Sequence, residues 1–358
     1  MDVKSNFRES VLALSPYGVS GHPAKIKLNQ NESPFDVPPE LKQEIIDKFL
    51  RMSWNRYPEV FPIHLPDQLS KIYGISSESI IVSNGSNELI YTVAMSIVQG
   101  GTEVLIPQPT FYLYEKVATI LGGNIKKVYA ERDLSLDEDK MLDLARRMNA
   151  GLIIVGSPNN PTGKSATRDF FKALVSATNA IVLVDEAYIE FSENESLMDL
   201  CREHKNLVVL RTFSKAFSLA GLRIGYLVAH PDTVREILKV KIPFTVNPLS
   251  EFTACELLNH KDLFADRVEQ IKRSKQLMMD RLSQINGVKV VKSDANFFLF
   301  AAPLPPNEIF DYLLERKSVL VRDVSSYPLL ERYLRVNAGT DEESLFFIES
   351  VKACLDGK

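Results

Sequence analysis

The sequence predicts an α/β protein with a large domain built on a mainly parallel sheet covered by helices, and a smaller C-terminal α/β domain. At 358 residues the chain is longer than a single hydrophobic core usually grows. From about Ser77, short runs rich in Val, Ile and Leu alternate with amphipathic helical stretches, which is typical of a parallel sheet covered by helices. A long amphipathic stretch, Asp262–Ile285, then separates this pattern from a second, shorter α/β pattern.

The expected strands of the large sheet are short apolar runs, each bounded by residues that favour turns. They are Ile80–Val82, Val104–Ile106, Leu152–Val155, Ile181–Val184, Leu207–Leu210 and Ile224–Val228. Because these runs do not alternate with polar residues, both of their faces are expected to be buried. The helices expected between them are Glu88–Val98, Tyr112–Leu121, Asp137–Met148 and Asp169–Ser176. In such a sheet, ligand-binding groups are expected at the carboxyl ends of the strands.

The domain boundary is expected at the start of the long helix, so that residues 31–262 form the large domain and residues 263–358 the small one. The strands expected in the small domain are Val288–Val291, Phe297–Phe300 and Val319–Val321, and its helices are Asn307–Arg316 and Glu342–Leu355. Residues 1–30 are polar and contain proline. They are expected to form an N-terminal arm that is able to pack with the small domain.

Composition excludes several classes of protein. The hydrophobic fraction of 45% and the charged fraction of 25% are ordinary for a globular chain, and a net charge of -4 argues against a nucleic-acid partner. The three cysteines and five histidines are scattered without metal-ligand or redox spacing, so no metal is expected. The charged start, and the lack of an apolar run near the roughly 20 residues that span a bilayer, predict a cytoplasmic protein without a membrane segment.

The first chemical signal is a cluster that directly follows the strand expected at Leu207–Leu210. It contains a lysine, two neighbouring hydroxyls and an arginine, which are Lys215, Thr212, Ser214 and Arg223. A lysine held at a strand end can condense with an aldehyde, and the hydroxyls and the arginine suit a phosphate dianion. The alternative is a solvated surface lysine, which is what most lysines are.

Acidic and amide side chains follow three other expected strands. Asp185 ends an apolar strand and Tyr188 follows three positions later, so the carboxylate suits a protonated ring nitrogen and the phenol an adjacent ring oxygen. Asn160 lies in a proline-rich turn after Leu152–Val155. A further turn, Gly85-Ser86-Asn87, leads into a helix whose free N–H groups suit a phosphate. Taken singly, a helix-capping Asp and ordinary turn chemistry explain these residues equally well.

Because all four clusters occur in one chain, each at a strand end, the sequence resembles the fold-type I pyridoxal-phosphate aminotransferases of class I/II from about Lys27 to Ala353. The resemblance implies pyridoxal 5'-phosphate as the cofactor, held covalently by Lys215. It implies catalytic roles for Lys215, Asp185 and Tyr188, with Asp185 on the pyridine nitrogen and Tyr188 on the ring hydroxyl. The cofactor-binding residues that it implies further are Gly85, Ser86, Asn87, Phe111, Asn160, Thr212, Ser214 and Arg223.

Within this family, the segments Lys27–Phe35, Asn55–Glu59 and Val321–Asp323 resemble the histidinol-phosphate aminotransferases. That resemblance implies transfer of an amino group between histidinol phosphate and glutamate or 2-oxoglutarate, in histidine biosynthesis. It also implies a homodimer in which Tyr57 reaches the cofactor phosphate of the neighbouring subunit. The implied substrate-binding residues are Asn31, Arg322 and Arg335.

Other interpretations remain open at this point. Threonine-phosphate decarboxylases and aromatic amino-acid aminotransferases share most of these motifs, and a regulatory or binding protein can retain the fold without turnover. An unrelated lysine-rich binding surface is a further alternative. Arg322 and Arg335 need an anion, because each lies at or inside a β-like segment, and a protein carboxylate such as Asp323 or Glu331 is an alternative to the substrate. Tyr91, Tyr112 and Tyr114 are interpreted as core aromatics rather than site residues.

Overall fold

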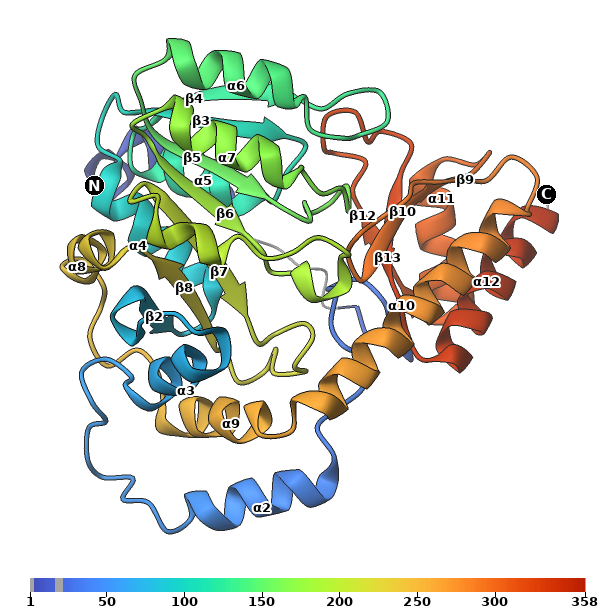
Figure 1. Cartoon of the computed structure of the whole chain (residues 1–358). Helices are drawn as coiled ribbons and strands as arrows, with labels where there is room; N and C mark the ends of the chain where they lie inside the picture. The colour runs from blue at the N-terminus through green and yellow to red at the C-terminus, as the bar shows by residue number, and fades with distance from the viewer. Residues whose placement is uncertain (1–2, 17–21, 358) are drawn as a thin grey trace.

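The computed structural model describes residues 3–16 and 22–357, and its centre is a seven-stranded sheet (Figure 1). The strand order is β2-β8-β7-β6-β5-β3-β4. The strands are β2 (Ile80–Ser83), β3 (Glu103–Gln108), β4 (Asn124–Tyr129), β5 (Ala150–Gly156), β6 (Ile181–Asp185), β7 (Leu207–Thr212) and β8 (Gly225–Ala229). Strand β8 runs antiparallel to both β2 and β7, and the other neighbours are parallel, so the predicted mainly parallel sheet is confirmed.

Edge strand β4 was not predicted from the sequence. It contains Asn124, Lys126 and Lys127, which are exposed, and it therefore lacks the continuous apolar run of the central strands. Charged side chains on an edge strand discourage pairing with another chain. The polar residues that prevented the prediction of this strand are therefore explained by its position at the edge of the sheet.

Helices cover both faces of the sheet. One face packs against α4 (Ser86–Ile97), α5 (Tyr112–Ile120) and α8 (Pro231–Leu238). The other face packs against α2 (Pro39–Phe49), α3 (His64–Tyr73), α6 (Glu138–Arg147), α7 (Arg168–Ala177) and α9 (Pro248–Leu258). Successive residues of β6 show that the two faces pack against different helices. Val182 and Val184 pack on the side of α6 and α7, and Leu183 packs on the side of α4 and α5.

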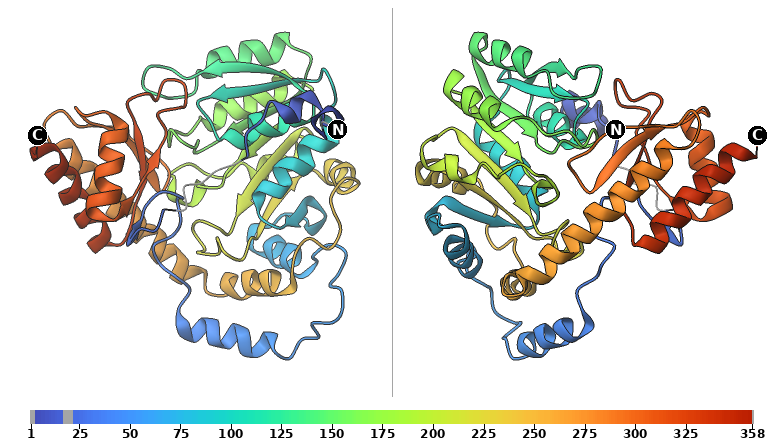
Figure 2. Two further views of the ribbon diagram at one scale, coloured as in Figure 1. Left: turned by 180° about the vertical axis from the view of Figure 1, so that it is seen from behind. Right: turned by 45° about the vertical axis from the view of Figure 1, so that its right-hand side comes forward.

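The C-terminal part is joined to the large sheet by the long helix α10 (Lys261–Ser283), which Figure 2 shows running between them. Its antiparallel sheet has the order β12-β13-β10-β9. The strands are β9 (Lys289–Val290), β10 (Phe297–Ala301), β12 (Arg322–Asp323) and β13 (Leu334–Asn337), and the helices are α11 (Pro306–Asp311), the π-helical turn η5 (Tyr312–Arg316) and α12 (Asp341–Asp356).

The strand predicted at Val319–Val321 corresponds to β11, which ends one residue earlier, and a separate short strand that was not predicted begins at Arg322. Strand β11 (Val319–Leu320) pairs in parallel with β1 (Ile26–Lys27) of the N-terminal arm, whereas β12 begins at Arg322 and pairs with β13. Val319, Leu320 and Val321 are buried and form the apolar run, whereas Arg322 is partly buried and Asp323 is exposed. The two strands therefore differ in burial as well as in their pairing partners.

Residues at the start of α10 pack in one hydrophobic core, and later residues of the same helix pack in another. Phe264 packs with the core of the large sheet, whereas Val268 and Ile271 pack with a core that continues to Cys354 and includes Leu28 of the arm. This change supports a boundary near residue 262, and the β1–β11 pair supports packing of the arm with the C-terminal part. We propose the domain division of the sequence analysis on these grounds.

Short elements complete the described chain. They are η1 (Val3–Asn6), α1 (Glu9–Leu12), η2 (Ser77–Ser79), η3 (Ile189–Phe191) and η4 (Met198–Arg202). Across residues 3–16 and 22–357, no helix combines the length and the apolar character needed to cross a membrane. The same residues contain no group of His, Cys, Asp and Glu side chains arranged to hold a metal ion.

Candidate active site

The carboxyl ends of β2, β5, β6 and β7 meet the C-terminal part around a cavity of about 320 Å³. The structure brings most of the predicted site residues together there. Those that line the cavity are Asn31, Ser86, Asn87, Phe111, Asn160, Asp185, Tyr188, Thr212, Ser214, Lys215, Arg223, Arg322 and Arg335. The parallel strands explain this convergence, because their carboxyl ends share one edge of the sheet.

Asp185 is the last residue of β6 and is only 7% exposed. Since Val184 faces the α6–α7 side of the sheet, Asp185 faces the opposite side, toward α5. Its carboxylate accepts hydrogen bonds from the Tyr114 hydroxyl at 2.8 Å and from the Ala187 backbone N–H at 3.0 Å. Burial raises the pKa of Asp185, while these two donors favour the ionised form. A protonated ring nitrogen facing this carboxylate would stabilise its charge further.

Tyr188 lies where two amide side chains converge. Its hydroxyl oxygen accepts hydrogen bonds from Asn31 Nδ2 at 3.0 Å and from Asn160 Nδ2 at 3.4 Å. Burial raises the pKa of Tyr188, so the phenol keeps its proton near neutral pH and is able to donate it in a hydrogen bond. Asn31 is itself held in place, because its backbone N–H donates to Asn337 Oδ1 at 3.0 Å.

Lys215 has the electrostatic environment of a reactive amine. Its Nζ donates to the Gln30 carbonyl oxygen at 2.8 Å. Burial lowers the pKa of Lys215 to about 7, and the positive charges of Arg335 and Arg223 act in the same direction against Glu32 and Asp185. A substantial fraction of this amine is therefore neutral and nucleophilic at physiological pH.

The residues predicted for the cofactor phosphate form one end of the cavity. Gly85, with φ of 81°, is the N-cap of α4, and the first two residues of the helix, Ser86 and Asn87, line the cavity, so the free N–H groups of this helix start suit a phosphate there. Arg223 Nη1 donates to Ser214 Oγ at 3.4 Å, and Thr212 Oγ1 donates to the same oxygen at 3.0 Å. A Cβ at Gly85 would lie 2.7 Å from Arg223 Nη2, and glycine is favoured here because residues with a Cβ rarely adopt a φ of 81°.

Two arginines face each other across β12 and β13 at the cavity wall. Arg322 is the register partner of Arg335, and Arg335 donates to Asn160 Oδ1 and, at 2.7 Å, to the Asn29 carbonyl oxygen. The carboxylates considered as alternative partners, Asp323 and Glu331, accept backbone N–H groups of Ser325 and Leu329. Since like charges directly opposite on a sheet repel each other, this wall favours an anion.

Tyr57 lies outside the cavity formed by its own chain. Its side chain is 85% exposed, and its ring centroid lies 5.0 Å from that of Phe244. The two aromatic rings line a separate surface hollow together with Asn55 and Arg56. This position suits the predicted contact with a neighbouring subunit, which stays a prediction.

Sequence reasoning missed Tyr114. It was interpreted as a core aromatic, and it does pack in the core below α5, but its hydroxyl also reaches Asp185 inside the cavity. The signal was its position three residues after Phe111 at the start of a helix, because residues three apart share one face. Tyr112, Tyr327, Gln30 and Glu32 also line the cavity without having been predicted to do so.

These groups fit pyridoxal phosphate. The buried carboxylate, the buried phenol and the amine of low pKa suit its ring nitrogen, its ring hydroxyl and its aldehyde, respectively. The helix N-terminus with Arg223, Thr212 and Ser214 suits its phosphate. Phe111, the N-cap of α5, contributes an aromatic ring to the same cavity.

Known proteins resemble the chain over nearly its whole length. The family model for aminotransferase class I and II matches residues 23–351. The histidinol-phosphate aminotransferase of Chlorobaculum parvum is 44% identical over 354 residues, which cover 99% of either chain. The histidinol-phosphate aminotransferase of Prosthecochloris aestuarii is 41% identical over 351 residues, 98% of either chain.

Two solved structures share the fold at lower sequence identity. The histidinol-phosphate aminotransferase of Sinorhizobium meliloti, in complex with pyridoxal-5'-phosphate, has a TM-score of 0.89 at 23% identity, and the match covers 99% of this chain and 98% of that one. The L-threonine-O-3-phosphate decarboxylase of Porphyromonas gingivalis has a TM-score of 0.81 at 24% identity, and the match covers 92% and 99%. At these identities the likeness concerns the fold alone.

Proposed function

The chain belongs to the class I and II aminotransferase family, and from this premise we propose that it is a pyridoxal-phosphate-dependent histidinol-phosphate:2-oxoglutarate aminotransferase of histidine biosynthesis. The observation that carries the proposal is the 44% and 41% identity, over nearly the whole chain, to two histidinol-phosphate aminotransferases. The fold of a threonine-phosphate decarboxylase is also similar, with a TM-score of 0.81 against 0.89 for the Sinorhizobium meliloti enzyme, but its 24% identity supports only a common architecture.

When bound, pyridoxal phosphate would supply an aldehyde that condenses with amines and a ring that withdraws electrons from the substrate carbon. Asp185 would hold the ring nitrogen in its protonated form, and Tyr188 would donate a hydrogen bond to the ring oxygen. Ser86, Asn87, Thr212, Ser214 and Arg223 would bind the phosphate. We propose these roles because the cavity presents each group at the place that its chemistry requires.

Lys215 has two tasks in this proposal. As a neutral amine, Nζ would hold the cofactor covalently through its aldehyde. When it is not bound to the cofactor, the same Nζ would serve as the base and acid that moves a proton, which requires a pKa near the working pH. The pKa of about 7 that burial and Arg335 produce meets this requirement.

Arg322 and Arg335 would bind the anionic end of the substrate. Their opposed positions on β12 and β13 place two guanidinium groups at the wall of a cavity that also contains Lys215. An arginine fork binds phosphate or carboxylate through charge-assisted hydrogen bonds, so the pair suits histidinol phosphate in one half-reaction and 2-oxoglutarate in the other. Asn31, beside Tyr188, would contact the substrate at the inner end of the cavity.

We further propose that two copies of the chain pair so that Tyr57 of each copy completes the cofactor site of the other. The exposure of Tyr57 and Phe244 supports this, because large aromatic side chains at a surface are typical of subunit contacts. A cytoplasmic location is part of the same proposal and is to be checked by cell fractionation.

The decisive experiment supplies purified protein with pyridoxal phosphate, histidinol phosphate and 2-oxoglutarate and measures glutamate. We expect glutamate to form in proportion to the histidinol phosphate consumed, and Lys215→Ala to form none. Parallel incubations with phosphothreonine, monitored for carbon dioxide, and with aromatic amino acids test the other activities. Carbon dioxide release, or faster turnover of an aromatic amino acid than of histidinol phosphate, would contradict the proposed substrate.

A further inference from the structure

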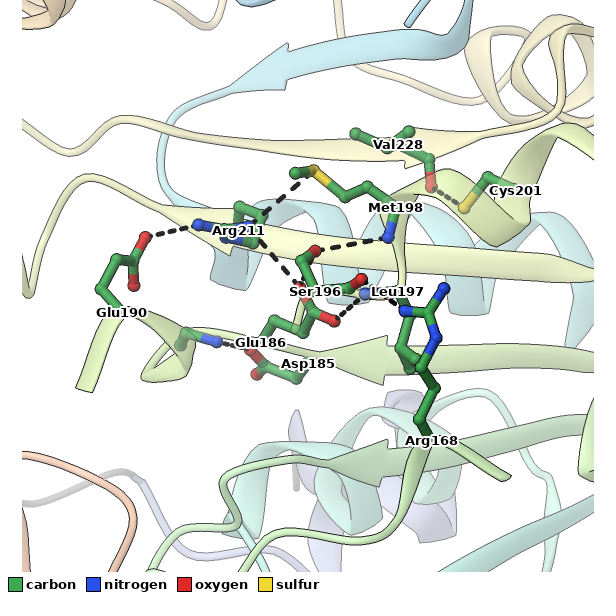
Figure 3. Close-up of polar contacts among 11 residues, drawn as sticks. Arg168, Asp185, Glu186, Glu190, Ser196, Leu197, Met198, Cys201, Arg211 and Val228 are labelled. Carbon is green, nitrogen blue, oxygen red and sulfur yellow. Dashed lines mark hydrogen bonds and ion pairs between the residues drawn. The ribbon is translucent and has the colours of Figure 1, made fainter. Parts of the chain in front are cut away.

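A buried cluster of charged side chains lies next to the candidate active site but outside its cavity (Figure 3). Arg211 Nη2 donates to Glu190 Oε1 at 2.7 Å, and Arg211 Nη1 lies 3.6 Å from Glu186 Oε2. Glu186 is also bonded by the Ser196 hydroxyl at 2.5 Å and by the Leu197 N–H at 2.7 Å. Glu186 is 1% exposed and Arg211 is 5% exposed, so these charges are held away from water.

The cluster occupies the opposite side of the sheet from the cofactor-binding residues. In β7, Val209 packs in the core beneath α6 and α7, and Arg211 follows it on the same face. Thr212 therefore faces the cavity while its neighbour Arg211 faces away from it. At the end of β6, the side chains of Asp185 and Glu186 likewise lie on opposite sides, since Asp185 lines the cavity and Glu186 contacts Arg211.

One guanidinium thus connects segments that carry different parts of the site. Glu186 directly follows Asp185, and Glu190 lies two residues after Tyr188 on the turn η3. Arg211 directly precedes Thr212 and stands four residues before Lys215. Backbone bonds contribute as well, because the Glu186 N–H donates to the Leu210 carbonyl at 3.0 Å.

We propose that Arg211 is a positioning residue, which holds the segment carrying Asp185 and Tyr188 against the strand end that carries Thr212 and leads to Lys215. This inference rests on the proposed function, because it concerns groups that bind the cofactor. A buried ion pair is seldom required for stability, since apolar side chains of similar volume pack as well. A guanidinium that binds two carboxylates does, however, impose one relative orientation on the segments that it joins.

The test compares variants of Glu190, which stands two positions from Tyr188, whereas Glu186 and Arg211 are each directly adjacent in sequence to a cofactor-binding residue. Glu190→Gln retains an oxygen that accepts from Arg211, whereas Glu190→Leu does not. Arg211→Met removes both ion pairs. Lys275→Met is the matched control, because Lys275 is a buried cation in α10 that donates to the Ser293 and Ala295 carbonyls, away from the cavity.

Three quantities are measured on the cofactor-loaded proteins: the thermal midpoint, the dissociation constant of pyridoxal phosphate, and the pH midpoint of the visible absorbance. For Glu190→Leu and Arg211→Met we expect the dissociation constant to rise about tenfold and the pH midpoint to move by about half a unit or more. Glu190→Gln is expected to restore both quantities to near wild-type values. Lys275→Met is expected to lower the thermal midpoint alone.

The results separate the possible explanations. If Glu190→Leu lowers the thermal midpoint as Lys275→Met does, and leaves the dissociation constant and the pH midpoint unchanged, the cluster is merely structural and the inference is overturned. The same conclusion follows if Glu190→Gln behaves like Glu190→Leu. If the wild-type protein itself binds no pyridoxal phosphate, the proposed function fails instead. Should Arg211→Met not fold, the two Glu190 variants still decide the question.

Discussion

The reactivity proposed for Lys215 comes from its surroundings rather than from its residue type. Burial is the largest cause of its lowered pKa, and the positive charge of Arg335 is the next. A neutral amine is favoured when the charged form loses its hydration and lies near other cations. Other lysines show that burial by itself does not identify a catalytic group, because burial also lowers the pKa of Lys275, to about 8, and Lys275 only bonds backbone carbonyls.

A pH dependence follows for attachment of the cofactor. Only the neutral amine attacks an aldehyde, and the neutral fraction of Lys215 rises with pH through a pKa of about 7 rather than 10.5. The rate at which cofactor-free protein develops its visible absorbance band with pyridoxal phosphate should therefore reach half of its plateau near pH 7. Stopped-flow absorbance measures this rate. Arg335→Leu should move the midpoint upward, and a midpoint near pH 10 in the wild type would refute the assigned environment.

Removing the amine should abolish covalent attachment altogether. We expect Lys215→Ala to lack the visible band and the borohydride-stable adduct, and to lose activity by about 10⁴-fold or more, since both nucleophile and proton carrier are gone. Mass spectrometry after reduction locates the adduct. An adduct that persists on another lysine of the variant would place the reactive amine elsewhere.

At the scale of single elements, the first turn of α5 contributes more than packing. Phe111 is the N-cap of this helix, and Tyr114 extends from the first turn to the end of β6, where it hydrogen-bonds Asp185. The carboxylate then has two protein donors, one from a helix and one from the backbone of its own segment. Two independent elements therefore orient the group proposed to hold the ring nitrogen.

Tyr114→Phe tests the contribution of the helix. Loss of one hydrogen bond to a charged acceptor should lower kcat about tenfold, with the protein still folded and still binding pyridoxal phosphate. Steady-state kinetics and cofactor titration measure the two effects. Tyr91→Phe in α4 is a suitable control, since Tyr91 is a partly buried tyrosine on a helix of the same face but does not line the cavity. Equal losses in both variants would argue against a role for the Tyr114 hydroxyl.

The antiparallel strands β12 and β13 carry the two arginines that we propose to recognise the phosphate of the substrate. If Arg322 and Arg335 bind the substrate phosphate, Arg322→Ala and Arg335→Ala should each weaken histidinol phosphate about 10- to 100-fold more than histidinol. The KM for 2-oxoglutarate reports whether the same side chains bind a carboxylate. Arg332→Ala is the control, because Arg332 is exposed and lies three residues before Arg335. Equal losses for both amines would exclude phosphate recognition at this wall.

At the scale of the whole molecule, the site lies where the large sheet and the C-terminal part meet. Tyr188 and Ala216 follow strands of the large sheet, yet they pack in the core that continues through β10 and α12. Asn31, from the segment after the arm, reaches Tyr188 and Asn337 and so links both parts. In the proposed dimer, Tyr57 of one copy would complete the cofactor site of the other copy.

Mixed dimers test this pairing directly. If Tyr57 acts on the neighbouring subunit, Tyr57→Ala and Lys215→Ala chains that are unfolded and reassembled together should recover about a quarter of wild-type activity, because half of the dimers then have one intact site of two. Each variant assembled alone should remain much less active. Activity of the mixture that does not exceed the average of the two separate variants would show that Tyr57 acts within its own chain, or not at all.

The sequence was sufficient to predict the main strands, their alternation with helices and the residues at the strand ends. These features are local, since an apolar run followed by a polar turn reports burial and chain reversal without any knowledge of the partner strand. The predicted cofactor-binding residues between Ser86 and Arg223 that line one cavity do so because the carboxyl ends of parallel strands lie at one edge of the sheet. Resemblance to a known family added the expected role of each residue.

The tertiary structure decided what depends on contacts between distant segments. It paired β11 with β1 of the arm and the neighbouring strand β12 with β13, although the two strands are nearly continuous in sequence. It placed the hydroxyl of Tyr114 on Asp185, 71 positions further along the chain. It also directed Arg211 away from the cavity and against Glu186 and Glu190. Spacing in a sequence records none of these contacts, since each is set by which elements pack together and by the face that each side chain occupies.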